Sequence, residues 1–395
     1  MDKNLELESQ NILPKDQENA CLIGRLWIPG VTDGPSPIWI DDKKVYDLAP
    51  YAPTISQLLE KEDLADTLRS LSGLNYIGSL DDILKNTNPI QQDHSKPWFL
   101  APCDLQAIKA SGVTFVSSML ERVIEEQALG DWSMAEQTRK QISELIGDDL
   151  TDIKPGSDEA MNVKKILIEQ NAWSQYLEVG IGRDAEIFTK SQPMSSVGIG
   201  AEIGIHPESN WNNPEPEIVL AVNSKGHIVG ATLGNDVNLR DFEGRSALLL
   251  GKAKDNNASC AIGPFIRLFD EKFSLNDIRN ANITLTVNGL DGFLLEGKSS
   301  MKYISRDPLE LVKQCNGDYH QYPDGMVLFL GTMFSPTKDR DEPGQGFTHK
   351  VGDIVKIQTP LLGSLVNQVN TCDKIPPWIF GTSALMRNLA QRGLL

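Results

Sequence analysis

From about Ile187 onward, the sequence is a succession of short apolar segments separated by glycine-containing turns. They read SSVGIGAEIGI, EIVLAVNSKGHIVGATLG, ITLTVNG, GMVLFLGTMF and GDIVKIQTPLLGSLVNQVN. Short segments rich in valine and isoleucine and bounded by turn residues are typical of β-strands. Long helical patterns do not alternate with them, as a doubly wound parallel fold would require. The sequence therefore predicts an α+β, β-rich fold with a sandwich-like or roll-like core.

The chain before Ile187 has fewer strand-like segments and more helical patterns. Residues 1–100 combine apolar and polar alternation (CLIGRLWIP, PSPIWI, KKVYDLA) with the helical pattern TISQLLEKEDLADTLRSL, which predicts a small N-terminal α/β domain. Residues 101–395 form the predicted catalytic domain. Within it, residues 122–176 are mostly charged and have helical spacing, which predicts a helical insertion.

Charge and hydropathy exclude several classes of partner. The formal net charge is −17, and such an acidic chain repels phosphate backbones and anionic lipids, so no nucleic-acid or membrane partner is expected. No apolar run approaches the roughly 20 residues that cross a bilayer. The acidic, polar start MDKNLELESQ differs from a signal peptide. A cytoplasmic protein is therefore expected. The five cysteines are scattered and show no paired metal-ligand spacing.

Three acidic residues lie close together in the strand-like segment that begins at Trp211. Glu215 and Glu217 are two residues apart, so their side chains share one face of a strand. The segment NSKG predicts a hairpin turn that would place Asp236 on the same face. Pairing Val222 with His227 would set Glu217 opposite Thr232, Glu215 opposite Gly234 and Asn213 opposite Asp236. Gly234 would then leave space between the carboxylates.

Such an arrangement suggests a site for a metal ion. Like charges a few ångströms apart resist joint ionisation, and a divalent cation removes that cost. Ligation by oxygen alone favours Mg²⁺, with Mn²⁺ or Ca²⁺ possible, over Zn²⁺. The alternative is that Glu215 and Glu217 decorate the solvent face of an edge strand, where acidic residues discourage aggregation.

The sequence also resembles a known family. EPEIVL, GATLGNDVNLRD, LLLGKAKD, GMVLFLGT and GDIVKI follow one another in the order found in the fumarylacetoacetate hydrolase superfamily. The run from Lys190 to Pro264 is the most specific part of this resemblance. Within the superfamily, the segments FTKSQPMSSVGIGAEIG, NNPEPEIVLAVNS and GNDVNLRDFEGRSALLLGKAKDNNASCAIGPFIRLFD are most similar to the bacterial 2-keto-3-deoxy-D-pentonate dehydratases. The resemblance implies a mixed β-roll catalytic domain, assembled as a homodimer or homotetramer.

The resemblance also implies roles for individual residues. It identifies Glu215, Glu217 and Asp236 as ligands of the divalent ion. Arg240, Lys252 and Thr332 beside Gly331 correspond to residues that hold the carboxylate and keto end of a pyruvate-like substrate, and Lys252 is also a candidate catalytic residue. Without the resemblance, Arg240 and Lys252 would be read as ordinary ion-pair partners on an acidic protein.

One segment departs from the family pattern. Hydrolytic members carry a His and Glu pair, but here GVTFVSSMLE has Ser118 at the position of the His and keeps Glu121. A serine is no general base near neutral pH, so we assign Ser118 to substrate binding. Glu121 is the candidate for proton transfer, with Lys190 as a second candidate. Glu121 could instead be a helix-surface acid.

The expected activity is therefore that of a hydro-lyase with a small-molecule 2-keto acid as substrate. It would dehydrate a 2-keto-3-deoxy-D-pentonate of the D-arabinonate or D-xylonate series to 2,5-dioxopentanoate, in non-phosphorylative pentose catabolism. The alternatives within the family are an acylpyruvate or diketo-acid hydrolase and a 2-keto diacid decarboxylase. A non-catalytic, metal-bound ligand sensor is the alternative from another class.

Overall fold

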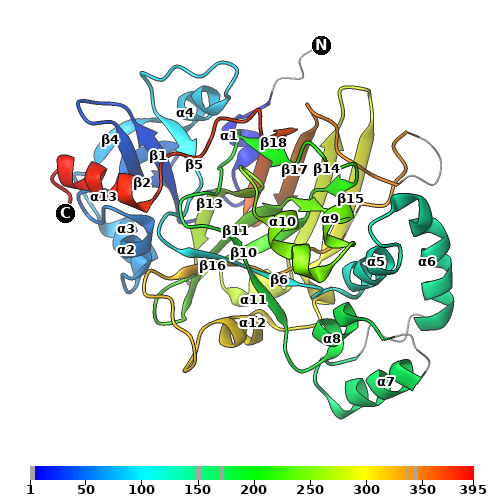
Figure 1. The fold of residues 1–395 in the computed structure, drawn as a ribbon. Coiled ribbons are helices and arrows are strands. Elements are labelled where there is room, and N and C mark those ends of the chain that lie inside the picture. The colour runs from blue at the N-terminus through cyan, green and yellow to red at the C-terminus, as the bar shows by residue number, and fades with distance from the viewer. Residues whose placement is uncertain (1–4, 147–152, 170–172, 335, 342–345) are drawn as a thin grey trace.

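The computed structural model describes residues 5–146, 153–169, 173–334, 336–341 and 346–395. Most strands join one twisted sheet that runs through the centre of the molecule (Figure 1). In order across it, the sheet contains β4 (Asn75–Ser79), β3 (Lys44–Asp47), β2 (Gly34–Asp41), β1 (Leu22–Ile28), β13 (Cys260–Leu268), β11 (Ile228–Asp236), β10 (Pro216–Val222), β16 (Met326–Phe329), β6 (Ala107–Gly112) and β7 (Glu186–Ser191), while β5 (Trp98–Leu100) pairs with β1.

A second sheet packs against the middle of the first. Its order is β15 (Leu294–Ser300), β14 (Asn282–Asn288), β17 (Ile354–Thr359), β18 (Gly363–Thr371) and β8 (Glu202–Ile205). Leu233 of β11 belongs to the same buried cluster as Ile283, Val355 and Leu365 of the second sheet. The apolar core thus lies between the two sheets, as the strand-rich sequence predicts. A short ladder joins β9 (Asn212–Asn213) to β12 (Asn238–Leu239).

The helices lie around these sheets. The described ones are α1 (Ser9–Ile12), α2 (Ile55–Leu59), α3 (Leu64–Ser70), α4 (Leu80–Thr87), α5 (Val116–Gln127), α6 (Trp132–Ile146), α7 (Asp158–Glu169), α8 (Gln175–Ile181), α9 (Arg240–Glu243), α10 (Leu250–Lys254), α11 (Leu275–Arg279), α12 (Pro308–Cys315) and α13 (Thr382–Gln391), with 3₁₀ turns η1 (Ala247–Leu249) and η2 (Met301–Tyr303). Within the described ranges, no helix is both long and apolar enough to cross a bilayer.

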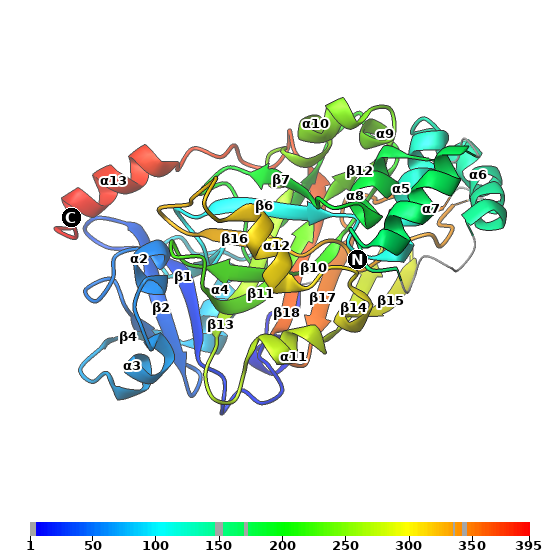
Figure 2. The same cartoon turned by 90° about the horizontal axis from the view of Figure 1, so that it is seen from below.

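Helices α5 to α8 gather at one end of the molecule, opposite the N-terminal strands and α13 (Figure 2). They have a small apolar core of their own, to which Val123, Leu177 and Trp211 contribute. The predicted helical insertion is thereby confirmed for the residues that the structure describes.

The N-terminal strands continue the central sheet. Leu22 and Ile23 of β1 pair with Arg267 and Ile266 of β13. The hydrogen-bonded ladder therefore crosses the predicted boundary at residue 100, and whether residues 1–100 are an independent domain stays a prediction.

The β10–β11 hairpin forms as predicted, but in a different register. Glu217 pairs with Gly234 and Val219 pairs with Thr232, so the predicted pairing of Glu217 with Thr232 is wrong by two residues. One residue comes from the turn, where Val222 pairs with Ile228, and one from a bulge between Ala221 and Val222. A slip of two residues keeps every side chain on its face of the sheet, whereas a slip of one would not.

The space predicted at Gly234 is also filled. A Cβ at this position would lie 2.3 Å from Cε1 of Phe329 and 2.6 Å from Cγ2 of Val219. The missing side chain therefore makes room for the Phe329 ring, and not for an ion.

Candidate metal centre and active site

Three buried carboxylates meet where the β10–β11 hairpin opens. Glu215 precedes β10, Glu217 lies within it, and Asp236 ends β11. Each offers one oxygen atom, and these atoms lie within 4.8 Å of one another. The backbone fixes this approach, because the Asp236 N–H donates to the Glu215 carbonyl oxygen at 3.1 Å. The structure therefore brings together the three residues that the sequence predicts as metal ligands.

The charges of these carboxylates are unevenly compensated. Burial raises the pKa of Glu217 well above its usual range, and the charges of Asp236 and Glu215 raise it further. One Glu217 oxygen accepts the Gly331 N–H at 2.7 Å. Burial would likewise raise the pKa of Asp236, but Lys190 and Lys254 lower it overall. All three buried donors are oxygen atoms, and the negative charge of Glu217 is only partly compensated. Such a set of donors fits a hard divalent cation.

Two lysines reach the carboxylates from the side of α10 and β7. Nζ of Lys254 lies 2.6 Å from Oε2 of Glu215 and 3.1 Å from Oδ2 of Asp236. Nζ of Lys190 lies 2.9 Å from Oδ1 of Asp236. Burial would lower the pKa of Lys254, but Asp236, Glu215 and Glu243 raise it well above its usual value. The Lys254 ammonium group is therefore held charged beside the cluster.

The lysine predicted from the GK motif is not part of this cluster. Lys252 is exposed, and its Nζ lies 5.1 Å from the centroid of the Phe242 ring. Successive helical residues turn by about 100°, so Lys252 and Lys254 of α10 face nearly opposite ways. Lys254, and not the predicted Lys252, is therefore the lysine of α10 that contacts the carboxylates.

The structure does not bring Glu121 and Arg240 to the carboxylate cluster either. Nη2 of Arg240 lies 2.9 Å from Oε2 of Glu121, and Arg139 also pairs with Glu121 at 2.9 Å. Burial would raise the pKa of Glu121, but the two arginines lower it overall. The Arg240 guanidinium stacks on Trp211, with Cζ 4.4 Å from the ring centroid. Glu121 is thus ion-paired in this structure and is placed poorly to accept a substrate proton.

The other predicted substrate-binding residues lie close to the carboxylates. Ser118 and Thr332 line the same small cavity as Glu217. The Ser118 hydroxyl donates to the Phe115 carbonyl oxygen at 2.9 Å, and Thr332 donates to Phe334 at 3.1 Å. Both acceptors are backbone carbonyl oxygens, so neither hydroxyl is paired with a group that could act as a base.

Sequence reasoning missed several charged residues of the site. Arg122, Glu186, Glu243 and Lys254 line the cavity with the triad. The spacing of Ser118, Arg122 and Glu125 by four and three residues places them on one face of α5, and this was a signal that the sequence offered. Glu186 offered no such signal, because only the pairing of β7 with β6 brings it to the site.

Glu186 is a further carboxyl group that lines the cavity. It pairs with Gly112 across the β6–β7 ladder, and a Cβ on Gly112 would lie 1.8 Å from its Oε2, so only glycine leaves room for this carboxyl group. Burial and the charge of Glu243 raise the pKa of Glu186 to about 7. Groups with a pKa near the working pH are effective general bases.

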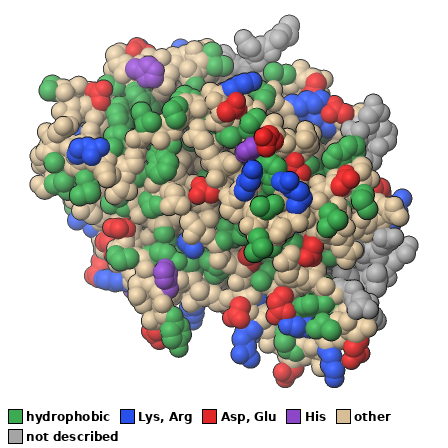
Figure 3. Space-filling model, viewed as in Figure 1, with side chains coloured by type: hydrophobic (Ala, Val, Ile, Leu, Met, Phe, Trp, Pro, Cys, Tyr) green, Lys and Arg blue, Asp and Glu red, His purple; other side chains and the backbone are tan. Residues whose placement is uncertain are grey.

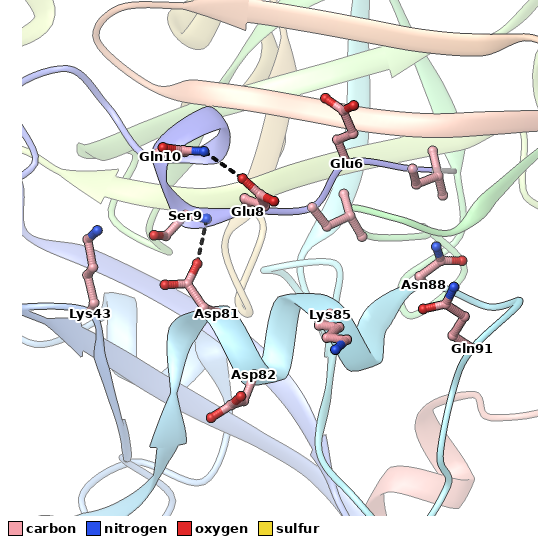
Figure 4. Close-up of a pocket in the computed structure, with 12 residues that line it drawn as sticks. Glu6, Glu8, Ser9, Gln10, Lys43, Asp81, Asp82, Lys85, Asn88 and Gln91 are labelled. Atoms are coloured by element: carbon pink, nitrogen blue, oxygen red, sulfur yellow. Dashed lines mark hydrogen bonds between the residues drawn. The ribbon is translucent and has the colours of Figure 1, made fainter. Parts of the chain in front are cut away.

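The cavity enclosed by these residues is about 10 Å³, which is room for one water molecule at most. A larger hollow of about 620 Å³ lies elsewhere, between the N-terminal segment and α4. Figure 4 shows two hydrogen bonds among its polar groups, in which Asp81 accepts the Ser9 N–H and Gln10 donates to Glu8. Buried titratable side chains line the small cavity, so the volume of a cavity alone does not identify the candidate active site.

The surface agrees with the charge balance. On the face drawn in Figure 3, lysine and arginine side chains are scattered among acidic ones, and no broad basic patch appears on that face.

The fold and the buried carboxylates define a β-rich, two-sheet protein with a cluster of oxygen donors that could hold a metal ion. A family model described as fumarylacetoacetate (FAA) hydrolase C-terminal matches residues 158–370, just over half of the chain. The chain therefore belongs to the fumarylacetoacetate hydrolase family, which confirms the resemblance seen in the sequence.

Two curated relatives share about half of the chain. A 2-dehydro-3-deoxy-D-arabinonate dehydratase of Saccharolobus solfataricus is 32% identical over 190 residues, covering 48% of this chain and 60% of that protein. A probable 2-keto-3-deoxyxylonate dehydratase of Haloferax volcanii is 29% identical over 203 residues, covering 51% of this chain and 66% of that protein. The chain thus spans less than two thirds of either relative.

A solved structure supports the fold over a longer range. A 2-keto-3-deoxy-D-arabinonate dehydratase complexed with magnesium and 2,5-dioxopentanoate superposes with a TM-score of 0.60 at 21% identity, covering 89% of this chain and 99% of that chain. The predicted β-rich, fumarylacetoacetate hydrolase-like fold is confirmed.

Proposed function

We propose that this chain is a metal-dependent hydro-lyase that dehydrates a 2-keto-3-deoxy-D-pentonate to 2,5-dioxopentanoate. The observation that carries the proposal is the buried cluster of Glu215, Glu217 and Asp236, flanked by Lys254 and Glu186. The names of the two curated relatives and the ligands of the solved dehydratase support the choice of substrate. The proposed cofactor is Mg²⁺.

Glu215, Glu217 and Asp236 would hold the ion, which when bound supplies Lewis-acid stabilisation of negative charge on the keto and carboxylate oxygens of the substrate. The Lys254 ammonium adds a fixed positive charge beside them. The cavity must widen to admit a five-carbon acid, and in its narrow form it excludes bulk water.

Glu186, which lines the cavity, would accept the C3 proton of the substrate. The same carboxyl group can return that proton to the C4 hydroxyl, so that the C4–O bond breaks and water leaves. A further proton shift from C5 to C3 turns the resulting 3,4-alkene into the enol of the C5 aldehyde, which ketonises to 2,5-dioxopentanoate. We assign the proton transfers to Glu186, in place of Glu121 and Lys190, because Glu186 lines the cavity.

Carbon–carbon hydrolysis is not favoured by the residues present. The Ser118 hydroxyl faces the Phe115 carbonyl oxygen and offers no base to activate water. A decarboxylase would use the same metal ligands, and product analysis distinguishes it because it releases CO₂. A homodimer or homotetramer stays a prediction, which light scattering of the purified protein would test.

The test is an assay of the purified protein with Mg²⁺ and 2-keto-3-deoxy-D-arabinonate or -xylonate, in which the aldehyde is followed through a coupled aldehyde dehydrogenase. We expect product that disappears with EDTA and in Glu217→Gln. Glu296→Gln is the matched control, because Glu296 is exposed on β15 and should retain activity. Product that survives EDTA and Glu217→Gln, or cleavage of acylpyruvates without any dehydration, would refute the proposal.

A further inference from the structure

Arg122 extends from helix α5 into the metal centre. Its side chain is buried, and its Nη2 pairs with Oε1 of Glu215, a proposed metal ligand. Its Nη1 lies 2.7 Å from Oε2 of Glu125 and 2.9 Å from Oε2 of Glu243. One guanidinium group therefore bridges three carboxylates that come from α5, α9 and the start of β10.

These contacts continue outward through ions of alternating charge. Glu125 also accepts from Nε of Arg240 at 2.6 Å, and Arg240 pairs with Glu121. Glu121 in turn pairs with Arg139 of α6. The position of Glu215 is therefore linked, pair by pair, to two helices of the insertion.

A guanidinium group is required by this geometry, and a positive charge alone would not satisfy it. A planar fork can present separate N–H groups to Glu215 and to the Glu125 and Glu243 pair, whereas a lysine presents a single point charge on a flexible stem. Lys254 already occupies the other oxygen of Glu215. Between them, the two cations fix the plane of this carboxylate.

We propose that Arg122 is a positioning residue that holds Glu215 in the orientation required to bind the metal ion. The inference rests on the proposed function, which assigns Glu215 to the metal. Contacts of this kind to a ligand typically contribute 10–100-fold to metal affinity. An effect of charge alone would have the opposite sign, because losing a cation beside a metal site makes that site more attractive to Mn²⁺.

The experiment measures Mn²⁺ binding by titration calorimetry in the absence of substrate, for the wild type, Arg122→Gln and Arg122→Lys. Positioning predicts that both variants bind Mn²⁺ about 10–100-fold more weakly. Arg267→Lys is the matched control, because Arg267 is equally buried and pairs through a fork with Asp16 away from the carboxylate cluster. Its Mn²⁺ affinity should equal that of the wild type.

Each outcome bears on the inference. The inference would be overturned if a folded Arg122→Gln variant bound Mn²⁺ as tightly as the wild type or more tightly. It would also be overturned if Arg122→Lys bound Mn²⁺ with the affinity of the wild type. The Lys variant keeps the positive charge, so it still gives a test if the Gln variant does not fold. If the wild type turns over substrate and both variants bind Mn²⁺ with the affinity of the wild type, only this inference is refuted. A wild type that does not bind Mn²⁺ refutes the proposed function as well.

Discussion

At the scale of single residues, only one of two lysines on the same short helix faces the carboxylates, and the proposed function gives a role to that one. Lys254 contacts Glu215 and Asp236, whereas Lys252 is exposed beside Phe242. The two residues belong to the same short helix, so they form a natural pair for testing the site.

Replacing Lys254 with Met should lower kcat/KM by about 100-fold or more, because a buried cation beside the reacting groups is lost. Lys252→Met should stay within about twofold of the wild type, as most surface substitutions do. The measurement is the coupled aldehyde assay on both variants. Equal losses in the two variants would mean that α10 lies differently in the working enzyme.

The grouping of the three proposed metal ligands could be predicted from the sequence because strand periodicity is robust. Glu215 and Glu217 share a face by their spacing, and a hairpin brings Asp236 to the same face whether or not the register slips by two. Lys254 and Glu186 could not be predicted in this way. The rotation of a short helix and the pairing of strands distant in sequence depend on tertiary packing, which local spacing does not encode.

At the scale of elements, the β10–β11 hairpin is fixed by how closely its strands pack. Gly234 lies against Phe329 of β16 and Val219 of β10. The bulge between Ala221 and Val222 shifts the register relative to an unbroken ladder. A bulge has no fixed sequence signature, and this accounts for one of the two residues by which the predicted pairing was wrong; the other comes from the turn, where Val222 pairs with Ile228.

Gly234→Ala should destabilise the protein by about 1–3 kcal/mol, because the added methyl group overpacks the core. The control is Gly251→Ala in α10, where nothing lies within 4 Å of the new Cβ. That change should be neutral or slightly stabilising, because Ala is a better helix former than Gly. Urea unfolding of both variants gives the comparison. An unchanged midpoint in Gly234→Ala would show that Phe329 can move aside without cost.

At the scale of the whole molecule, a buried histidine should shape the response of stability to pH. His349 is buried and its Nδ1 lies 3.1 Å from Oδ2 of Asp353, which also pairs with Arg340. Burial lowers the pKa of His349 below its usual 6.5, although Asp353 opposes this shift. The folded state therefore prefers the neutral ring.

The sign of the effect follows from this preference. Below pH 6.5 the unfolded chain protonates His349 more readily than the folded chain does. The stability that the neutral ring contributes is therefore fully present above pH 6.5 and is lost as the pH falls through the folded pKa. The free energy of unfolding should decrease between pH 6.5 and pH 5, by at most about 1.4 kcal/mol per pH unit from this group.

Urea unfolding at several pH values checks this prediction. His349→Gln should flatten the slope between pH 5 and pH 7, while His94→Gln, at an exposed position, should keep the slope of the wild type. A His349→Gln variant with the slope of the wild type would assign the acid sensitivity to other groups.

The whole-molecule architecture was only partly predictable. The strand-rich core and the helical insertion follow from patterns within single segments. The junction of β1 with β13 joins segments more than 200 residues apart, and nothing in either segment alone specifies that partner.

That junction determines what would happen to a shortened chain. β13 has β1 on one side and β11, which carries Asp236, on the other. A chain beginning at residue 101 would leave β13 without its partner strand at Ile266 and Arg267, and a bare sheet edge can recruit strands from other molecules. The N-terminal strands thus cover a sheet edge that lies one strand away from the hairpin carrying Asp236.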